Sequence, residues 1–253
     1  SLGVGKRRFK AIDGLTCQFA ANRVTALLGH NGAGKTTTIR LILGLIAPDA
    51  GRILCRGEPM QRSHRQGLGY MPEVRKLPGE LTVREILAHQ LRLYDSRWTT
   101  AAARRERIDR QIETVGLQAF QRKRIAQLSK GMARRLAWAQ ATVHDPGFLI
   151  LDEPFSGLDP VARLEMQGWM RTLADAGTGM LVSTHEFWTV QELCHALYVM
   201  KQGRMVYASA VDAEAAASHH ELRLASTDAA TLAALAALRD EAVARGIEVV
   251  NYG

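Results

Sequence analysis

The chain has 253 residues, 47% of them hydrophobic, and a formal net charge of +8 at pH 7. This length suits one large α/β domain with at most a small appendage. The chain holds no apolar run near the ~20 residues that cross a bilayer, and no signal-length apolar stretch follows the basic residues 1–10. We therefore expect neither a membrane span nor a signal peptide. Three widely separated cysteines favour a reducing cytoplasm over a disulfide framework.

The excess positive charge has two interpretations. Arginine clusters at residues 7–8, 104–105, 122–124 and 134–135 could attract nucleic acid or an anionic membrane surface. They could instead lie on solvated helix faces. We favour the second interpretation, because no aromatic residues interleave the clusters as a base-stacking platform requires.

The N-terminal part of the chain predicts strands around a loop and a helix. From Ile12 to about Gly57 it reads as a strand, a second strand at 23–28, a glycine-rich loop, a helix at 37–43, a turn and a further strand. Residues 67–72 then read as a short strand ended by proline.

The loop at residues 29–37 has the pattern G-x-x-x-x-G-K-T of a P-loop. Glycines let successive backbone N–H groups point at one anion, and the following helix adds its positive end. Lys35 is predicted to reach the β- and γ-phosphates of a nucleotide, and the Thr36 hydroxyl to ligate Mg²⁺. The alternative is a chance glycine-rich turn, which the order strand, loop, helix disfavours.

Helical periodicity with few strand formers marks residues 81–94 and 99–115 and predicts a helical insertion over about 78–145. Continuous apolar strands return afterwards, at 148–151, 179–183 and 196–200. Such strands alternating with helices predict a parallel sheet buried on both faces.

The last segment, 211–253, reads as a small β-α-β appendage to a domain at 1–210. A loosely ordered, alanine-rich tail is the alternative, but the leucine spacing favours a packed helix.

Two acidic residues end the strand at 148–151. Asp152 is expected beside the P-loop, where it would hold Mg²⁺ through water. Glu153 is placed to polarise the water that attacks the γ-phosphate. Helix capping is the alternative role for consecutive acids after a strand. The following Pro154 and the matching P-loop make capping alone a poor explanation.

Three further motifs accompany the P-loop and the acidic strand in a fixed order. They are Leu-Ser-Lys-Gly-Met at 128–132, Ser-Gly-Leu-Asp at 156–159 and Ser-Thr-His at 183–185. Together the motifs resemble those of the ATP-binding cassette (ABC) ATPases over about residues 10–208. The resemblance implies a P-loop NTPase with a RecA-like α/β core, an antiparallel β-subdomain and an inserted helical subdomain.

Carried over residue by residue, the resemblance implies an ATP and Mg²⁺ site. Asp152 supports Mg²⁺, Glu153 is the general base, and His185 contacts the γ-phosphate and the attacking water. The phosphate-binding residues are Asn31, Gly32, Ala33, Gly34, Lys35, Thr36 and Thr37.

The resemblance also implies an interface with a second cassette. The signature residues Ser129 and Gly131, with Asp159 of the D-loop, would act on ATP held by the other subunit. Two copies would then sandwich two ATP molecules head to tail, with positive helix dipoles reaching a phosphate only on closure.

The chain departs from the family pattern at several positions. Lys130 and Met132 replace the third and fifth residues of the usual Leu-Ser-Gly-Gly-Gln signature. Glu73 stands where the family usually has the glutamine of the Q-loop, and its carboxylate could ligate Mg²⁺ or orient water. These departures resemble cassettes of ABC-2-type exporters. For the adenine-stacking ring, Phe9 is the candidate; it could equally be a core residue, and Arg8 could stack instead.

The function that follows is the energy-coupling ATPase of a transporter. ATP-driven closure of a dimer would push on separate integral membrane permease subunits, at the cytoplasmic face of the inner or plasma membrane. The alternative is a soluble ABC ATPase acting on nucleic acid or ribosomes. Such relatives usually fuse two cassettes or insert a long coiled coil, whereas only about 90 residues separate Lys35 from Leu128. We therefore do not expect nucleic acid as a partner.

Overall fold

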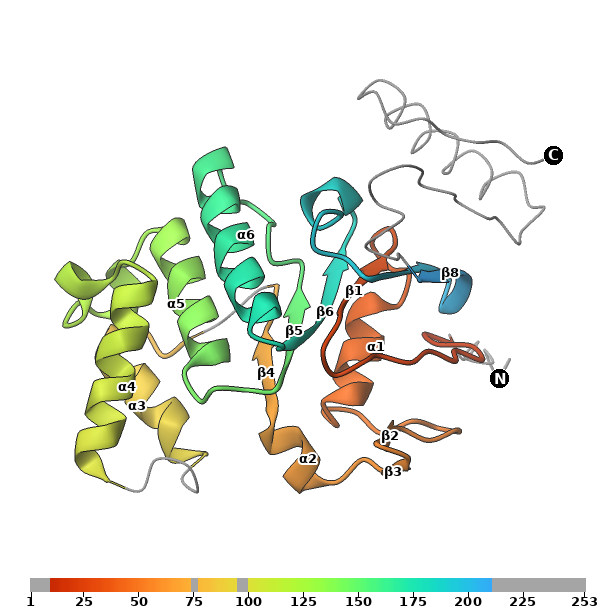
Figure 1. Cartoon of the computed structure of the whole chain (residues 1–253), viewed down its shortest axis with the longest axis horizontal. Helices are drawn as coiled ribbons and strands as arrows, with labels where there is room; N and C mark the ends of the chain where they lie inside the picture. Colours follow the sequence, from red (N-terminus) through yellow and green to blue (C-terminus); the bar gives the residue numbers. More distant parts are fainter. Residues whose placement is uncertain (1–9, 74–76, 95–99, 211–253) are drawn as a thin grey trace, which may run out of the picture.

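The computed structural model describes residues 10–73, 77–94 and 100–210 (Figure 1). Phe9 and the predicted appendage at 211–253 lie outside the described residues. The strands are β1 (Val24–Leu28), β2 (Leu54–Cys55), β3 (Glu58–Pro59), β4 (Leu68–Met71), β5 (Phe148–Asp152), β6 (Gly179–Thr184), β7 (Ala196–Lys201) and β8 (Arg204–Ala210). The helices are α1 (Lys35–Ile42), α2 (Arg62–Gln66), α3 (Val83–Arg92), α4 (Ala101–Thr114), α5 (Lys130–Thr142) and α6 (Pro160–Asp175). Short 3₁₀ turns lie at η1 (Gln118–Phe120), η2 (Ile125–Gln127) and η3 (Phe187–Thr189).

A six-stranded sheet in the order β4-β5-β6-β1-β7-β8 forms the centre of the fold. Its first five strands are parallel, and β8 pairs antiparallel with β7 at the edge. The predicted parallel sheet is therefore confirmed for five strands. Because β5, β6 and β1 are neighbouring parallel strands, their carboxyl ends lie at the same edge of the sheet. In open α/β sheets, ligands bind at this edge.

Successive residues of each strand point to opposite sides of the sheet. Both sets of side chains are buried, so the sheet is covered on both faces. On one face, residues such as Val24, Leu149 and Val182 pack against α3 to α6. On the other face, Leu27 and Ile150 pack against Ile39 of α1. Figure 1 shows α1 on one side of the sheet and α3 to α6 on the other.

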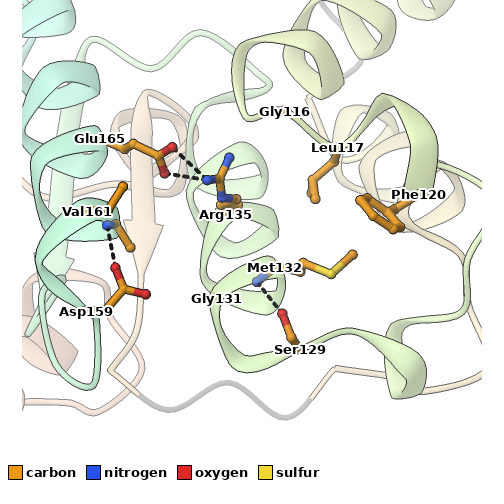
Figure 2. Close-up of a pocket in the computed structure, with 11 residues that line it drawn as sticks. Gly116, Leu117, Phe120, Ser129, Gly131, Met132, Arg135, Asp159, Val161 and Glu165 are labelled. Atoms are coloured by element: carbon orange, nitrogen blue, oxygen red, sulfur yellow. Dashed lines mark hydrogen bonds and ion pairs between the residues drawn. The ribbon is translucent and has the colours of Figure 1, made fainter.

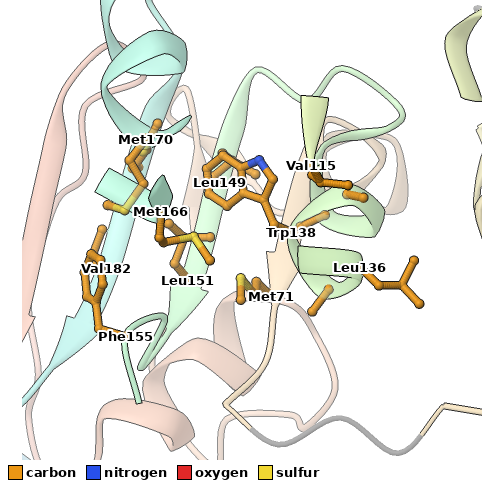
Figure 3. Close-up of a cluster of buried hydrophobic side chains, with 14 of the residues drawn as sticks. Met71, Val115, Leu136, Trp138, Leu149, Leu151, Phe155, Met166, Met170 and Val182 are labelled. Carbon is orange, nitrogen blue, oxygen red and sulfur yellow. The ribbon is translucent and has the colours of Figure 1, made fainter. Parts of the chain in front are cut away.

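The larger core has an indole and several thioethers at its centre. Figure 3 shows Trp138 of α5 packed among Leu149, Met166 and Met170. The Trp138 and Trp169 rings are stacked with centroids 5.9 Å apart. This packing fixes α5 and α6 against the sheet, so the loops that begin both helices are held by a rigid layer.

Strand β8 was not expected from the sequence. It follows β7 through a two-residue turn, in which Gln202 has φ 49° and Gly203 φ 78°. Two left-handed residues in a row suit a hairpin turn whose twist matches that of the flanking strands. The Gln-Gly pair is a weak hairpin signal beside Asn-Gly, so the sequence did not predict this hairpin.

The N-terminal described segment also differs from expectation. No strand is assigned within residues 10–23, where one was expected before β1. Alternate residues Leu15, Cys17 and Phe19 are half-buried, as in a strand, but the segment joins no ladder in the described part of the chain. The predicted antiparallel β-subdomain is present there only as the short hairpin of β2 and β3.

The helices predicted at 81–94 and 99–115 are confirmed as α3 and α4. Both begin with N-cap threonines: Thr82 forms a reciprocal capping box with Glu85, and Thr100 accepts from the Ala103 N–H. Such caps satisfy N–H groups that the first helical turn leaves without partners. Helix α5 then leads back to the sheet.

Among the described residues, no helix has the length and apolar character needed to cross a bilayer.

Candidate active site

The glycine-rich loop joins β1 to α1 at the carboxyl edge of the sheet. Gly34, immediately before Lys35, has φ 108°, a left-handed conformation that suits glycine. A Cβ at Gly34 would lie 2.9 Å from Ile12 Cδ1 and 3.0 Å from the Ala11 carbonyl oxygen, so a side chain has no room. The N-cap residue Gly34 has no side chain to cap α1, and the first turn of the helix holds no acidic residue. The amide groups there suit a bound anion.

Lys35 lies in a buried cluster of charged groups. Its side chain is 6% exposed, and its ammonium group donates a hydrogen bond to the Gly29 carbonyl oxygen. The ammonium also lies 3.1 Å from Glu153 Oε1, while Glu153 Oε2 lies 2.9 Å from His185 Nδ1. The Glu153 carboxylate thus bridges Lys35, which is predicted to bind phosphate, and His185, which is predicted to contact the γ-phosphate. A phosphate entering this site would compete with Glu153 for Lys35, because its oxygens are strong acceptors.

The oxygen ligands predicted for Mg²⁺ lie together. The Thr36 hydroxyl, in the first turn of α1, donates to Asp152 Oδ2 at 3.0 Å. Carboxylate and hydroxyl oxygens suit Mg²⁺, which usually binds one or two protein carboxylates together with substrate phosphates. Among the described residues, no group of three or more His, Cys, Asp or Glu side chains is placed to hold a metal by itself. A donor set of one carboxylate and one hydroxyl fits a Mg²⁺ ion that is also bound by the phosphates of a nucleotide.

The backbone of Glu153 is held in an unusual conformation. Its φ is 47°, which is uncommon for a residue with a side chain. Its N–H donates to both the carbonyl oxygen and the hydroxyl of Ser183, each at 3.1 Å. Backbone conformations of this kind persist where surrounding contacts fix them, and they concentrate at active sites. Here the carboxylate of Glu153 lies 3.1 Å from the Lys35 ammonium.

The other predicted phosphate-binding residues lie on the loop or in the first turn of α1. Asn31 and Gly32 are exposed, Ala33 is buried and Thr37 is half-buried. Glu73 is exposed and lies two residues beyond the end of β4. Its role as a Mg²⁺ ligand stays a prediction, as does the adenine-stacking role of Phe9, which lies outside the described residues.

The predicted signature and D-loop residues meet away from the phosphate-binding loop. Ser129 is the N-cap of α5 and accepts from the Met132 N–H at 3.3 Å. Asp159 is the N-cap of α6 and accepts from the Ala162 N–H at 2.9 Å. The N-termini of α5 and α6 line one cavity, and each helix is capped by the side chain of its own N-cap residue (Figure 2).

A cavity of about 520 Å³ lies over these two helix starts. Its polar lining includes Ser129 and Asp159, and its apolar lining includes Met132, Val161 and Phe120. Arg135 and Glu165 form an ion pair at 2.5 Å along one side, as Figure 2 shows. Of the described residues, those that line the cavity come from 116–165, so the P-loop contributes none.

Sequence reasoning assigned no contact with the acidic residues to two contributors to the site, Ser183 and Arg134. Ser183 donates to Asp152 Oδ1 at 2.5 Å, and the sheet register places these residues side by side. The only sequence signal was a hydroxyl at the end of the strand beside β5. Arg134 donates to the backbone of Glu153, and Arg135 pairs with Glu165. The interpretation of 134–135 as a solvated helix face is therefore wrong, because charge clustering does not reveal which face of α5 is covered.

Comparison with known proteins identifies the family. The sequence model of the ABC transporter family matches residues 12–156, more than half of the chain. The chain belongs to the ABC transporter family. It is 40% identical over 198 residues to the Nod factor export ATP-binding protein I of Paraburkholderia xenovorans, a match covering 77% of this chain and 64% of that protein. The chain thus spans under two thirds of the length of this ABC relative.

Solved structures agree with this family and its ATP-binding cassette fold. One is described as the ATP binding subunit of an ABC transporter; it is 29% identical, with a TM-score of 0.73, and the match covers 84% of this chain and 89% of that one. A dimeric bacterial ABC transporter cassette, MJ0796, has a TM-score of 0.75 at 20% identity, covering 82% and 93% of the respective chains. At that identity, the similarity to MJ0796 shows the fold alone.

Proposed function

We propose that this chain is the ATP-binding and ATP-hydrolysing subunit of an ABC exporter. The observation that carries the proposal is the contact of buried Lys35 and Glu153 with the exposed His185, beside buried Asp152. It brings a phosphate-binding ammonium, a carboxylate and an imidazole to the end of the P-loop. Phosphoryl transfer depends on such positioning and charge stabilisation rather than on covalent chemistry by the protein.

The proposed chemistry assigns one task to each group. The amides of the loop and the Lys35 ammonium bind the phosphates. Mg²⁺ bound by Thr36 and Asp152 would neutralise charge on the phosphate oxygens. Glu153 accepts a proton from the attacking water and orients it. The Nδ1 atom of His185 is hydrogen-bonded to Glu153, and we expect the other ring nitrogen, Nε2, to contact the γ-phosphate when the nucleotide displaces Glu153 from Lys35.

Hydrolysis in this proposal needs two copies of the chain. Ser129 and Asp159 line an open cavity that no P-loop residue reaches among the described residues. They would instead act on ATP bound by a second copy, head to tail. The dimeric arrangement described for the MJ0796 cassette, which shares this fold, supports the idea.

Transport is supported by the relatives. The 40% identical protein of Paraburkholderia xenovorans is named for export of Nod factor, and we propose export by separate permease subunits here. The ATPase would then lie at the cytoplasmic face of a membrane through those partners. The proposed ABC-2-type subfamily rests on the signature and Q-loop residues. The relatives' names do not favour the alternative of an ATPase that acts on nucleic acid or ribosomes.

Glu153→Gln tests the proposed chemistry. The amide keeps the shape but cannot accept the proton of the water, so ATP hydrolysis should fall by about 100-fold or more while ATP binding persists. Size-exclusion chromatography with ATP should show a trapped dimer. Glu113→Gln, an exposed change on α4, is the control and should hydrolyse ATP as the unchanged protein does. Unimpaired hydrolysis by Glu153→Gln would overturn the assignment of the base.

The same variant tests the partner. Tagged Glu153→Gln protein is trapped with ATP, isolated from detergent-solubilised cells, and analysed for associated proteins. A stoichiometric polytopic membrane protein would support the transporter proposal, and its sequence would point to the cargo. Ribosomes or nucleic acid without a membrane protein would contradict it and favour the alternative.

A further inference from the structure

One arginine connects the signature helix to the catalytic carboxylate by way of the backbone. Arg134 is half-buried on α5, one turn after the N-cap Ser129. Its guanidinium donates to four main-chain carbonyl oxygens. These are Pro154 at 3.0 Å from Nε, Glu73 at 2.7 Å and Pro72 at 3.4 Å from Nη1, and Glu153 from Nη2.

The four carbonyls belong to the two chain segments that leave β4 and β5. These strands are paired, and their last ladder partners are Met71 and Leu151. Beyond that pair, Pro72 and Pro154 have no N–H group, so the ladder cannot continue through them. The forked N–H groups of Arg134 satisfy the carbonyls where the ladder stops. The side chain therefore acts as a clamp across the ends of the two strands.

The clamp acts on the residue whose orientation matters most for hydrolysis. The N–H of Glu153 is fixed by Ser183 of β6, and its carbonyl oxygen by Arg134 of α5. With both ends of the residue held, the left-handed turn at φ 47° has support on each side. Glu73, on the other segment, is held by the same guanidinium.

The electrostatic surroundings fit a permanent clamp. Burial lowers the pKa of the Arg134 guanidinium, while the carboxylates of Glu73, Asp152 and Glu153 raise it. An arginine side chain stays protonated in proteins, so its N–H donors remain available at any physiological pH. Lysine would keep the charge but lacks the planar fork that reaches two segments at once.

We propose that Arg134 is a positioning residue, which sets the direction of the Glu153 carboxylate from the position of the signature helix α5. This inference rests on the proposed ATPase function. It predicts that the loss of Arg134 slows the chemical step more than it weakens ATP binding, because the phosphate-binding loop makes no contact with the clamp in the hydrogen bonds above.

Arg107 provides a matched control. It lies on α4 and is also half-buried, and its Nε and Nη2 donate to the carbonyl oxygens of Val143 and Thr142, each at 2.8 Å. Burial lowers the pKa of this guanidinium too. Arg107→Gln therefore removes the same kind of contact from the opposite end of α5, away from Glu153.

The experiment compares the full chain with Arg134→Gln, Arg134→Lys and Arg107→Gln. Three quantities are measured: the thermal unfolding midpoint, the affinity for a fluorescent ATP analogue, and kcat for ATP hydrolysis. For Arg134→Gln we expect kcat to fall by roughly 10- to 100-fold with affinity within about 2-fold, since small misplacements of reacting groups have effects of this size. Arg107→Gln should lower the unfolding midpoint similarly and leave kcat unchanged.

The two proposals fail in different ways. No hydrolysis by the unchanged chain would overturn the proposed function. Hydrolysis by the unchanged chain, with Arg134→Gln no slower than Arg107→Gln, would overturn only the positioning role. Should Arg134→Gln yield no folded protein, Arg134→Lys decides: a lowered kcat with unchanged affinity supports the clamp, and a kcat equal to that of the unchanged protein overturns it.

Discussion

The phosphate side and the signature side of this cassette differ in how their polar groups are satisfied. On the phosphate side (the loop at 29–34, α1, Asp152, Glu153 and His185), the charged groups are paired with one another. Lys35 and Glu153 are almost fully buried and 3.1 Å apart. On the signature side (Ser129, Gly131 and Asp159 with the cavity they line), the two N-cap residues are exposed, and within the described part of the chain their side chains bond to their own helices.

The helix N-termini differ in the same way. The N-cap of helix α1 is Gly34, which has no side chain to bond the first amides, so these suit an anion. Helix α5 is capped by the Ser129 hydroxyl, which can accept from the helix and still donate its own hydrogen to a phosphate oxygen. The phosphate side is thus assembled before a ligand arrives. The signature side offers a donor that needs a phosphate from elsewhere, which agrees with the proposed second copy.

The largest expected effect comes from breaking the phosphate side at Lys35. Lys35→Met removes the ammonium and should lower ATP hydrolysis by roughly 100- to 1,000-fold, the range seen when one donor to developing charge is lost. It also leaves Glu153 without its buried partner, so the free energy of unfolding should fall by about 3 kcal/mol. A hydrolysis assay and urea unfolding measure the two effects.

Lys10→Met is the control for that change. Lys10 is exposed and pairs with Asp13 at 3.4 Å, so its loss should change neither ATP hydrolysis nor the free energy of unfolding measurably. Equal hydrolysis by Lys35→Met and Lys10→Met would rule out the phosphate-binding role of Lys35.

The next effect separates capping from phosphate binding on the signature side. Ser129→Asp keeps a good N-cap for α5 but replaces a donor with a negative charge. The unfolding midpoint should hold, while hydrolysis should fall by roughly 10- to 100-fold because a like charge would face the phosphate of the second copy. Ser129→Ala should lower both ATP hydrolysis and the unfolding midpoint, because the missing cap costs about 1 kcal/mol of stability.

Thr100 gives the matching comparison on α4. Its hydroxyl caps that helix through the Ala103 N–H at 3.1 Å, and it does not line the cavity. Thr100→Asp should leave hydrolysis unchanged. If Ser129→Asp and Thr100→Asp hydrolyse ATP equally well, Ser129 is a cap and nothing more.

The two sides also differ in how well the sequence predicted them. Lys35, Thr36, Asp152 and Glu153 were expected together, because the motif follows a strand and parallel strands end at one edge. The structure brings Lys35 and Glu153 within 3.1 Å and Thr36 and Asp152 within 3.0 Å. Spacing along the chain was enough there, since each residue lies at the end of a buried strand or the start of the next helix.

Contacts that depend on register or on a helix face were not predictable in this way. Ser183 reaches Asp152 because β6 lies beside β5 in one register. Arg134 reaches the ends of β4 and β5 because one face of α5 covers them, whereas in the sequence it is only one member of a basic cluster. The edge strand β8 was missed because a Gln-Gly turn carries little signal, and the strand expected before β1 lacks a partner in the described residues.

A chain of contacts joins the two sides. Arg163, one turn after Asp159 on α6, donates to the Leu158 carbonyl oxygen at 3.2 Å and pairs with Glu186 at 2.7 Å. Glu186 directly follows His185. A shift of the D-loop on contact with a second copy would therefore reach His185 through one ion pair and one peptide bond.

The smallest expected effect comes from cutting this link. Glu186→Gln removes the charge that pairs with Arg163, and because both groups are partly exposed the stability should change by no more than about 1 kcal/mol. ATP hydrolysis should fall by about 3-fold, the size of change typical when a coupling contact between two sites is lost. Glu192→Gln is the control. Glu192 pairs at 3.1 Å with Arg171, which lies on α6 like Arg163, but Glu192 is farther along the chain from His185. Hydrolysis should be unchanged in that variant. A matching decrease in both variants would mean that α6 is merely loosened and that the D-loop and His185 are not coupled through Arg163.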